Sequence, residues 1–415
     1  MTTVMVVGIS KQERLKTKED LFEEATNIYD QLVEWRRGFH VFPELAFEER
    51  VTSSRVFQIL KSMPGVEVTQ AFGETTAVIG KISGKREGRA IMIRCPMDAL
   101  PLQEETDLTF ASCIPGVMHG CGHDAHMAVL LGVALLLSKR REMLDRSVVL
   151  VFQPAEEGLG GAKRLIDAGL LDSYNIDYAL GFHFWPKYGY GKLLLKPGIM
   201  TALSDRFHIS IQGVGGHAAA PHLAVDPWTI IAHVILAAQA LVGREIDPTE
   251  SAVISFGHLE AGEAHNVIPE QIDLWGSLRA LNVEVRDFLQ NRLEEMVPLL
   301  AKTFRGLGTI KYHRNYPQVI NDERLTSLVL RIARDSFGDE NLEILDRPLM
   351  AGEDFAFYTQ VIPSCFLLFG TGGKYWLHHP KYDVPEDLLP FAAGLEAYLA
   401  FCLSNMLSMG EDEIG

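Results

Sequence analysis

The chain has 415 residues, 47% of them hydrophobic and 22% charged, a composition that excludes a disordered or fibrous protein and a single small binding module. Its 38 basic and 54 acidic side chains give a net charge of −16 with no basic patch, so we expect no nucleic acid and no membrane surface as partner. Five scattered cysteines, no basic leader and no uninterrupted apolar stretch of about 18 residues predict a cytoplasmic protein.

The first 203 residues predict an α/β fold with a mostly parallel sheet. Short, nearly continuous apolar runs are typical of strands that are buried on both faces. Such strands are expected at 90–94, 147–152 and 178–184. Helical periodicity predicts helices at 17–36, 52–62, 124–138 and 160–169.

From Ser204 onward the pattern changes to alternating strands and two long helices, typical of an α+β unit with one exposed sheet face. Its strands are expected at 207–213, 251–259 and 271–279, and its helices at 226–242 and 283–304. The earlier pattern resumes near Asn315, with a helix at 322–336, a strand at 364–369 and a helix at 386–406. We therefore predict a discontinuous, doubly wound α/β domain of 1–203 plus 315–415, interrupted by an α+β, ferredoxin-like domain of 204–314.

A dense group of potential metal ligands lies at 119–126, where HisGlyCysGlyHisAspAlaHis precedes an apolar helix. Clusters of Cys and His in reduced proteins more often bind metal than serve packing. The alternative is that one or two of these residues, such as Asp124, cap the helix that follows. The density of the cluster favours a metal site. His119 and His126 individually are not expected to be ligands.

Two adjacent acids, Glu156 and Glu157, follow the predicted strand 147–152 directly. Ligands of open α/β sheets usually lie at this carboxyl edge, and adjacent side chains there point in different directions. One carboxylate can therefore bind a metal while the other faces the water that the metal activates, as metal-assisted hydrolysis requires. Two solvated loop acids are the alternative, and the position after a buried strand favours the catalytic interpretation.

Residues of ligand type also end two other predicted strands. Asp98 follows 90–94, and His183 lies at the end of 178–184. LeuHisHisPro at 377–380 adds a pair of histidines. Because the carboxyl ends of parallel strands meet at one edge of a doubly wound sheet, we expect these side chains to converge there.

Eight ordered sequence blocks resemble those of the metallo-aminoacylase and carboxypeptidase family, specifically the amidohydrolase branch that includes hippurate hydrolase and the plant hydrolases of indole-acetyl amino acids. The blocks span most of the chain and lie at 36–45, 97–101, 116–126, 151–158, 216–222, 266–269, 352–355 and 377–383. The resemblance implies a di-metal catalytic domain and an inserted domain that acts as a lid and dimerises. These correspond to 1–203 plus 315–415 and to 204–314.

The resemblance also implies roles for residues of the catalytic domain. The implied metal ligands are Cys121, His123, Glu157, His183 and His378. Glu156 would be the general base that takes a proton from the metal-activated water, and Asp98 would orient a ligand or the base. The implied cofactors are two divalent metal ions per chain, and this mixture of imidazole, carboxylate and thiolate suits Mn, Zn, Co or Ni.

In the inserted domain, the resemblance implies contacts with the substrate. His217 would reach across a dimer to the substrate carbonyl oxygen, while Asn266 and Arg279 would bind a substrate carboxylate, for which the two-pronged guanidinium is suited. From the residues alone, an exposed His217 and an Arg279 paired with an acid of the insert are the favoured interpretation. The implied partners are a small-molecule substrate that carries a carboxylate and a second copy of the chain, in a homodimer or a dimer-based oligomer.

One position departs from the pattern of the branch, because Pro96 stands where an aspartate is usual, two residues before Asp98. Proline offers no ligand atom, so the departure bears on the affinity for the second metal and on the choice of substrate. It leaves the five implied ligands in place.

Three functions remain open from the sequence. The first is a dinuclear metallohydrolase that cleaves the amide bond of an N-acyl amino acid or small peptide-like substrate. The second is the same scaffold acting on another carbon–nitrogen bond, such as that of an aryl amine or a carbamoyl group. The third is a binding protein without activity, and Glu156 argues against it because binding needs the ligands but not the base.

Overall fold

The computed structural model describes residues 11–86 and 88–407, and the chain divides into two compact units. The first unit comprises Met1–Met200, Ile320–Asp346 and Asp354–Gly415, and the second comprises Thr201–Val319 and Arg347–Glu353. The second unit is therefore longer at both ends than the predicted insert, and it includes a late segment that the sequence assigned to the catalytic domain. The late segment joins it because the backbone N–H of Ala202 donates to the carbonyl oxygen of Leu349 at 2.8 Å.

The first unit is built on an eight-stranded sheet with the order β1-β2-β4-β3-β5-β16-β6-β15. The bounds are β1 Val66–Gln70, β2 Val78–Ile82, β3 Ala90–Pro96, β4 Ser147–Gln153, β5 Ile176–Trp185, β6 Leu193–Leu195, β15 Leu342–Ile344 and β16 Ser364–Gly370. The central strands β4, β3, β5 and β16 run parallel, whereas β1, β2 and β6 pair with antiparallel neighbours. The predicted mostly parallel α/β sheet is confirmed, with its three continuous apolar runs forming central strands.

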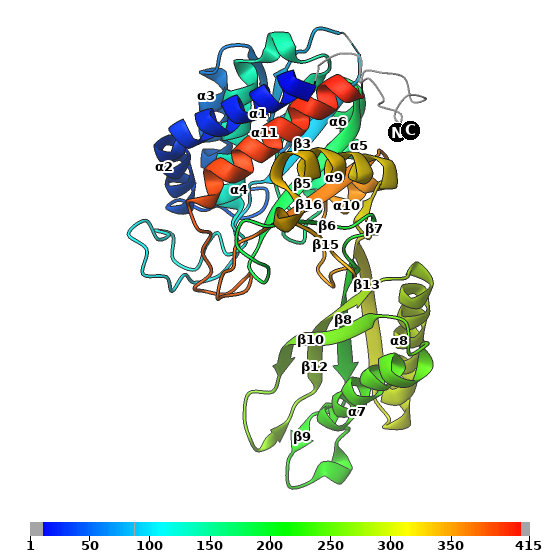
Figure 1. Ribbon diagram of the computed structural model, residues 1–415. Coiled ribbons are helices and arrows are strands. Elements are labelled where there is room, and N and C mark those ends of the chain that lie inside the picture. Colours follow the sequence, from blue (N-terminus) through cyan, green and yellow to red (C-terminus); the bar gives the residue numbers. More distant parts are fainter. Residues whose placement is uncertain (1–10, 87, 408–415) are drawn as a thin grey trace. The chain divides into compact units, whose positions relative to one another are not determined.

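Helices cover both faces of this sheet. Their bounds are α1 Lys11–Asn27, α2 Tyr29–His40, α3 Arg50–Lys61, α4 His123–Ser138, α5 Gly161–Asp167, α6 Leu170–Tyr174, α9 Glu323–Phe337, α10 Ala356–Thr359 and α11 Leu388–Met406. Helices α4 and α11 lie against one face with α1 beside α11 (Figure 1). On the other face, the ring of Phe355 before α10 packs so closely on Gly181 of β5 that a Cβ there would lie 2.8 Å from it.

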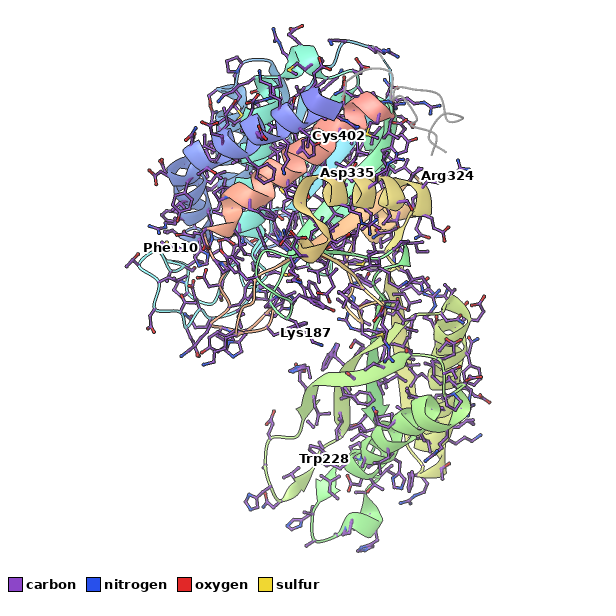
Figure 2. The ribbon with its side chains drawn as sticks, in the orientation of Figure 1. Phe110, Lys187, Trp228, Arg324, Asp335 and Cys402 are labelled. Atoms are coloured by element: carbon purple, nitrogen blue, oxygen red, sulfur yellow. The ribbon has the colours of Figure 1, made fainter. Side chains whose placement is uncertain are left out.

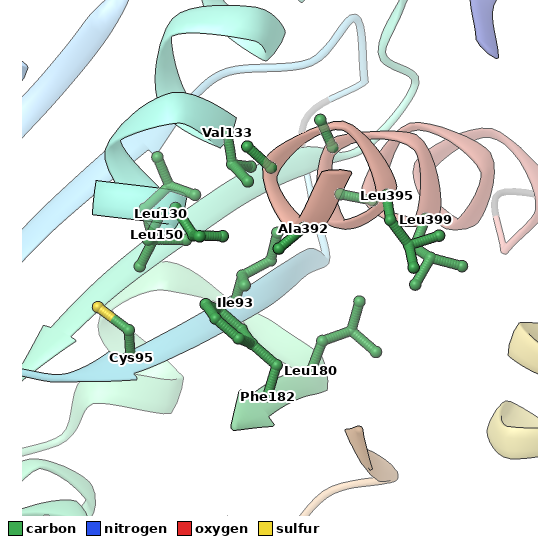
Figure 3. Packing of buried hydrophobic residues seen from close by; sticks show 14 of the residues in the cluster. Ile93, Cys95, Leu130, Val133, Leu150, Leu180, Phe182, Ala392, Leu395 and Leu399 are labelled. Atoms are coloured by element: carbon green, nitrogen blue, oxygen red, sulfur yellow. The ribbon is translucent and has the colours of Figure 1, made fainter. Parts of the chain in front are cut away.

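The main core lies between the sheet and helices α4 and α11. Ile93, Leu150 and Leu180 on the strands face Leu130 of α4 and Leu395 of α11 (Figure 3). Both helices are apolar on all sides, which is typical of helices buried within a large protein. Helix α11 has the length and composition of a membrane span, but 94% of its apolar window is buried inside the unit, so burial in the core explains its character.

Two predicted helices are divided in the structure. The helix expected over 17–36 becomes α1 and α2, which meet at Ile28, and the one expected over 160–169 becomes α5 and α6, separated by Gly169 in a left-handed conformation with φ of 81°. A residue at positive φ cannot continue a right-handed helix, so the second break follows from local backbone geometry.

The second unit has four antiparallel strands in the order β10-β12-β8-β13, with both long helices packed against the sheet. Its bounds are β8 Leu203–Gln212, α7 Pro227–Ala240, β10 Ala252–Ala261, β12 Gln271–Ala280, α8 Val283–Thr303 and β13 Leu307–Tyr316. This βαββαβ order is ferredoxin-like, as predicted. The sequence analysis did not predict β13, and a short ribbon of β9 (Gly216–His217) with β11 (Val267–Ile268) extends from the unit.

The surface of the second unit carries a second long apolar helix. Pro227–Glu245, which comprises α7 and the π-helical turn Leu241–Glu245, has the length and composition of a membrane span, with 33% of its apolar window buried. By itself this is weak evidence for a membrane, since helices that pack against another protein surface share the pattern.

Candidate functional site

The first unit brings the predicted ligands together at the carboxyl edge of the parallel strands. Loops after β3, β4, β5 and β16 meet the start of α4 there. Three overlapping groups have their ligand atoms within 4.8 Å of one another. They are Cys121 with His123 and His183, Cys121 with Glu157 and His378, and His123 with Glu156 and Glu157.

His123 is the first residue of α4 and is fully buried. Its Nδ1 lies 2.7 Å from the backbone carbonyl oxygen of Asp98. A carbonyl oxygen only accepts, so Nδ1 carries the proton and Nε2 presents a lone pair. That Nε2 atom is buried and has no hydrogen-bond partner among the described residues. The ring is thus fixed in the tautomer that a metal ligand needs.

His183, near the end of β5, is held in the same way. Its Nδ1 lies 2.7 Å from the carbonyl oxygen of Phe184, and its Nε2 lies 3.3 Å from the sulfur of Cys121. Burial is the main cause that lowers the pKa of His183 to about 3, and the neighbouring His123 adds to the shift. The imidazole is therefore neutral at physiological pH, which is the ligand form, and it shares its open side with the thiol.

Glu156 and Glu157 diverge from adjacent positions. Oε2 of Glu156 lies 4.0 Å from Nε2 of His123, whereas Oε1 of Glu157 lies 3.2 Å from Nε2 of His378. His378 is a non-glycine residue at φ of 64°, and its backbone N–H donates to the carbonyl oxygen of Gly120 at 2.8 Å. That bond places the loop after β16 beside the turn that carries Cys121.

Asp98 connects these elements, although it is not in any of the three ligand groups. Its Oδ1 accepts from the backbone N–H of Glu156 at 3.0 Å, and its Oδ2 accepts from that of Glu157 at 2.8 Å. Burial would raise the pKa of Asp98, but the neighbouring His123, together with these two N–H groups, holds it below its usual value. An ionised Asp98 therefore fixes the backbone of both acids and the ring of His123.

Two buried ligand atoms without a hydrogen-bond partner indicate that this site suits a divalent transition metal. Nε2 of His123 and Oε1 of Glu157 are buried atoms without a hydrogen bond, since His378 approaches Glu157 outside hydrogen-bond geometry. Unsatisfied buried polar atoms cost free energy, and native proteins usually provide a partner for them. A metal ion fits as the partner of these two atoms, because imidazole, carboxylate and thiol donors converge around them.

The remaining residues of the 119–126 cluster have structural contacts. Asp124 does not cap α4; its carboxylate instead pairs with Arg36 at 3.1 Å and with Nδ1 of His40 at 2.8 Å. Arg36 and His40 hold the pKa of Asp124 well below its usual range despite burial. Asp124 and Glu104 in turn raise the pKa of His40 to about 9, although burial opposes this. His126 accepts the backbone N–H of Phe184 on Nε2 at 3.0 Å. His119 is buried, and neither of its ring nitrogens has a hydrogen-bond partner among the described residues.

The second unit holds the other predicted site residues at two separate places. His217 and Asn266 lie together on the short ribbon: His217 pairs with Val267, the N–H of Ala218 donates to the carbonyl oxygen of Asn266 at 3.1 Å, and both side chains are exposed. Arg279 lies at the opposite end of β12, where Nη1 donates to the carbonyl oxygen of Met350 at 3.1 Å. Within the described residues no acid pairs with Arg279, and the joint arrangement of Asn266 and Arg279 is absent from a single chain.

Pro96 ends β3 and is buried, in register with Gln153 at the end of β4. Directly below, Arg94 and Asp354 form an ion pair with no exposed surface, and Gln153 Nε2 donates to both carboxylate oxygens of Asp354, at 2.9 and 2.8 Å. Asp354 lies in the GlyGluAspPhe block, but sequence reasoning gave it no role.

Two further groups at this edge carry no sequence signal of their own. The carboxylate of Glu49 accepts a hydrogen bond from the backbone N–H of Ala155, the residue before Glu156. Trp185, two residues after His183, packs edge-on against Trp376, two residues before His378, with ring centroids 5.6 Å apart. Because side chains two apart on a strand share a face, the ligand at 183 was itself the signal that could have identified Trp185.

Comparisons with known proteins identify the family of the chain. The model of a family described as peptidase family M20/M25/M40 matches residues 92–400. The chain is 38% identical to the N-acetyl-L-cysteine deacetylase of Bacillus subtilis, covering 86% of this chain and 85% of that protein. It is also 38% identical to the IAA-amino acid hydrolase ILR1-like 5 of Arabidopsis thaliana, covering 94% and 90%. A solved Bacillus subtilis structure, described as a dinuclear metal-binding peptidase of the M20 family, superposes with a TM-score of 0.75 at 31% identity, covering 91% and 99%.

Proposed function

The chain belongs to peptidase family M20/M25/M40 and is a metal-binding hydrolase, and we propose that it cleaves the amide bond of N-acyl amino acids with two divalent ions. The observation that carries this proposal is the divergence of Glu156 and Glu157. One carboxylate lies by His123 and the other by His378, so one acid is available to a reacting water while its neighbour binds metal.

The proposed ligands are Cys121, His123, Glu157, His183 and His378, and Mn, Zn, Co or Ni suit this set. When bound, the ions would act as Lewis acids that polarise the scissile carbonyl and lower the pKa of water. Glu156 would accept the proton of the attacking water and deliver it to the departing amine nitrogen. Asp98 would keep both acids in place through their backbone N–H groups.

We propose a homodimer, in which the two substrate-binding places of the second unit come from different copies. Arg279 and the ribbon with His217 and Asn266 lie at opposite ends of β12, and the eight residue steps from Gln271 to Arg279 span about 26 Å. A small substrate cannot touch both ends within one chain. His217 and Asn266 of one copy would therefore act with Arg279 of the partner subunit on the substrate carbonyl and carboxylate.

Helix α7 supports this assembly. Trp228 and Leu236, on the outer side of α7, are 43% and 71% exposed, and Figure 2 shows Trp228 on the second unit. Helix α7 packs on β12 and β8, and its Gln239 donates a hydrogen bond to the carbonyl oxygen of Ile254 in the edge strand β10. An exposed apolar helix near an edge strand has the composition of an interface between proteins.

The acyl group of the substrate would pack against the indole pair of Trp185 and Trp376. Trp376 is 49% exposed, although its loop is held at both ends, by the N–H of Thr371 on the carbonyl of Trp185 and by the N–H of His378 on Gly120. A large ring kept rigid and exposed beside two proposed metal ligands favours a flat, apolar acyl group.

The test is turnover of a panel that shares one amino acid and varies the acyl group, with metal-free protein and with protein reconstituted with Mn, Co, Ni or Zn. We expect hydrolysis of N-acyl amino acids only in the metal-loaded protein, with loss of activity on chelation. An aryl amide and an N-carbamoyl amino acid belong in the panel. Their preferential hydrolysis would replace the amide assignment with another carbon–nitrogen bond, and full activity without metal would contradict the mechanism.

A further inference from the structure

Glu49 occupies a helix-capping position but does not cap its helix. It is the residue before α3, where an acidic side chain ordinarily accepts the first free N–H groups. Glu44 performs that task instead, because its carboxylate accepts the backbone N–H groups of Val51 and Thr52 at 3.1 and 2.8 Å. The carboxylate of Glu49 is therefore available for another contact.

That contact is with the loop that carries the two catalytic-site acids. Oε1 of Glu49 accepts the backbone N–H of Ala155 at 2.9 Å, and Oε2 accepts the hydroxyl of Thr76. The side chain is completely buried, with no ion pair among the described residues. A buried carboxylate without a cation is costly, so this arrangement is expected only where the contact itself serves a purpose.

Ala155 has a strained backbone conformation, which a hydrogen bond to its N–H would stabilise. Ala155 has φ of 56°, a left-handed conformation that is strained for a residue other than glycine. The next two N–H groups, of Glu156 and Glu157, both go to Asp98. Three consecutive backbone N–H groups therefore donate to two buried carboxylates, those of Glu49 and Asp98. The left-handed turn at Ala155 sets the directions of these N–H groups.

We propose that Glu49 is a positioning residue for the reaction: its hydrogen bond to Ala155 holds the left-handed turn that separates the directions of Glu156 and Glu157. The inference rests on the proposed function, in which one acid meets the reacting water and the other meets metal. It assigns a role to a residue that is distant in sequence from both and that touches neither substrate nor metal.

Two conservative variants separate the contact from the charge. Glu49→Gln removes the charge but keeps an oxygen at the same reach for the N–H of Ala155, while Thr76 can accept from the new amide. Glu49→Asp keeps the charge but is one methylene shorter, so it loses the contact. We expect Glu49→Gln to stay close to the wild type, and Glu49→Asp to lower kcat about 10–100-fold with little change in KM.

Metal affinity provides a readout that does not depend on turnover. Because Glu157 follows the same turn, Glu49→Asp should also weaken binding of Zn or Mn about tenfold in calorimetry, and Glu49→Gln should not. The reverse order of the two variants would show that the charge matters and would overturn the proposal. If no N-acyl amino acid is hydrolysed but the metal-affinity order holds, the proposed function fails while the role of Glu49 in the turn stands.

Glu44→Gln is the matched control, since Glu44 belongs to the same segment and caps α3 without touching the loop. It should lower the melting temperature through a weaker cap and leave kcat and metal affinity unchanged. A loss in Glu44→Gln equal to that in Glu49→Asp would mean that general destabilisation explains both, and the positioning role would be wrong.

Discussion

Oε1 of Glu157 lies 3.2 Å from Nε2 of His378, a contact that joins the loop after β4 to the loop after β16. The preceding acid, Glu156, turns instead toward His123 on α4. Two neighbouring carboxylates thus serve different sides of one cluster, because Asp98 fixes their backbone from below. Substitution of Glu156 should therefore affect turnover, whereas substitution of Glu157 should affect metal binding.

Glu156→Gln should reduce turnover by about 10²–10⁴-fold while the metal content stays near normal, because an amide keeps the shape but cannot accept a proton. Glu157→Gln should lose metal first, because it removes a charged ligand. Both are measured as kcat and bound metal per chain after reconstitution. If the phenotypes were exchanged, the roles would be exchanged, and near-normal turnover in both would contradict the catalytic interpretation of the pair.

Trp376→Ala should change the preference among acyl groups. With the amino acid held constant, kcat/KM for a benzoyl substrate should fall about 2–13-fold, which corresponds to the roughly 0.5–1.5 kcal/mol typical of an aromatic contact. The kcat/KM for the acetyl substrate should change little. Met143→Ala is the control, since Met143 is 42% exposed but precedes β4, at the amino end of the sheet. Equal losses for both acyl groups would show that Trp376 acts on the loop and not on the acyl group.

The sequence predicted the central strands of the large sheet but missed the edge strand β13, for a physical reason. Strands buried on both faces must be apolar throughout, so β3, β4 and β5 stand out as continuous runs. Strand β13 is an edge strand whose buried side shows only through Ile310 and Tyr312, with Lys311 between them. Its alternation is too short and too polar to distinguish from a loop.

The site was predictable where ligands follow strands and unpredictable where contacts are long-range. Cys121, His123 and His183 are marked by their density or by their position at a strand end. Neither signal marks Glu49 or Asp354, because their partners lie far away in sequence and include the backbone N–H groups of Ala155 and Ala162. Any residue type supplies a backbone N–H, so no sequence pattern records the pairing.

The assembly can be tested on the two sides of the second unit. Leu236→Asp places a charge on the exposed side of α7 and should shift sedimentation at micromolar concentration from dimer to monomer, with loss of activity. Leu299→Asp is the control, since Leu299 is 57% exposed on α8, the helix packed beside the opposite edge strand β13. A fully active monomer in the wild type would contradict both the dimer and the cross-subunit role of His217.

Glu396 should make the stability of the first unit fall as the pH rises. It lies in the middle of α11 with no exposed surface, and neither carboxylate oxygen has a hydrogen-bond partner among the described residues. Burial raises the pKa of Glu396 to about 8. The folded chain therefore keeps this proton between about pH 4.5 and 8 while the unfolded chain releases it, so unfolding is favoured by roughly 1.4 kcal/mol per pH unit in this range.

The measurement is the free energy of unfolding by urea at pH 6, 7, 8 and 9. Glu396→Gln should flatten the slope between pH 6 and 8 relative to the wild type, because its side chain does not titrate, and Glu396→Leu should in addition be more stable at pH 8. Above pH 8 the contribution of Glu396 levels off, since both states have then lost the proton. The exposed Glu142 supplies the control, and Glu142→Gln should keep the wild-type slope. A wild-type slope in Glu396→Gln would mean that Glu396 is ionised in the folded chain, and a cation or water must then reach it within the core.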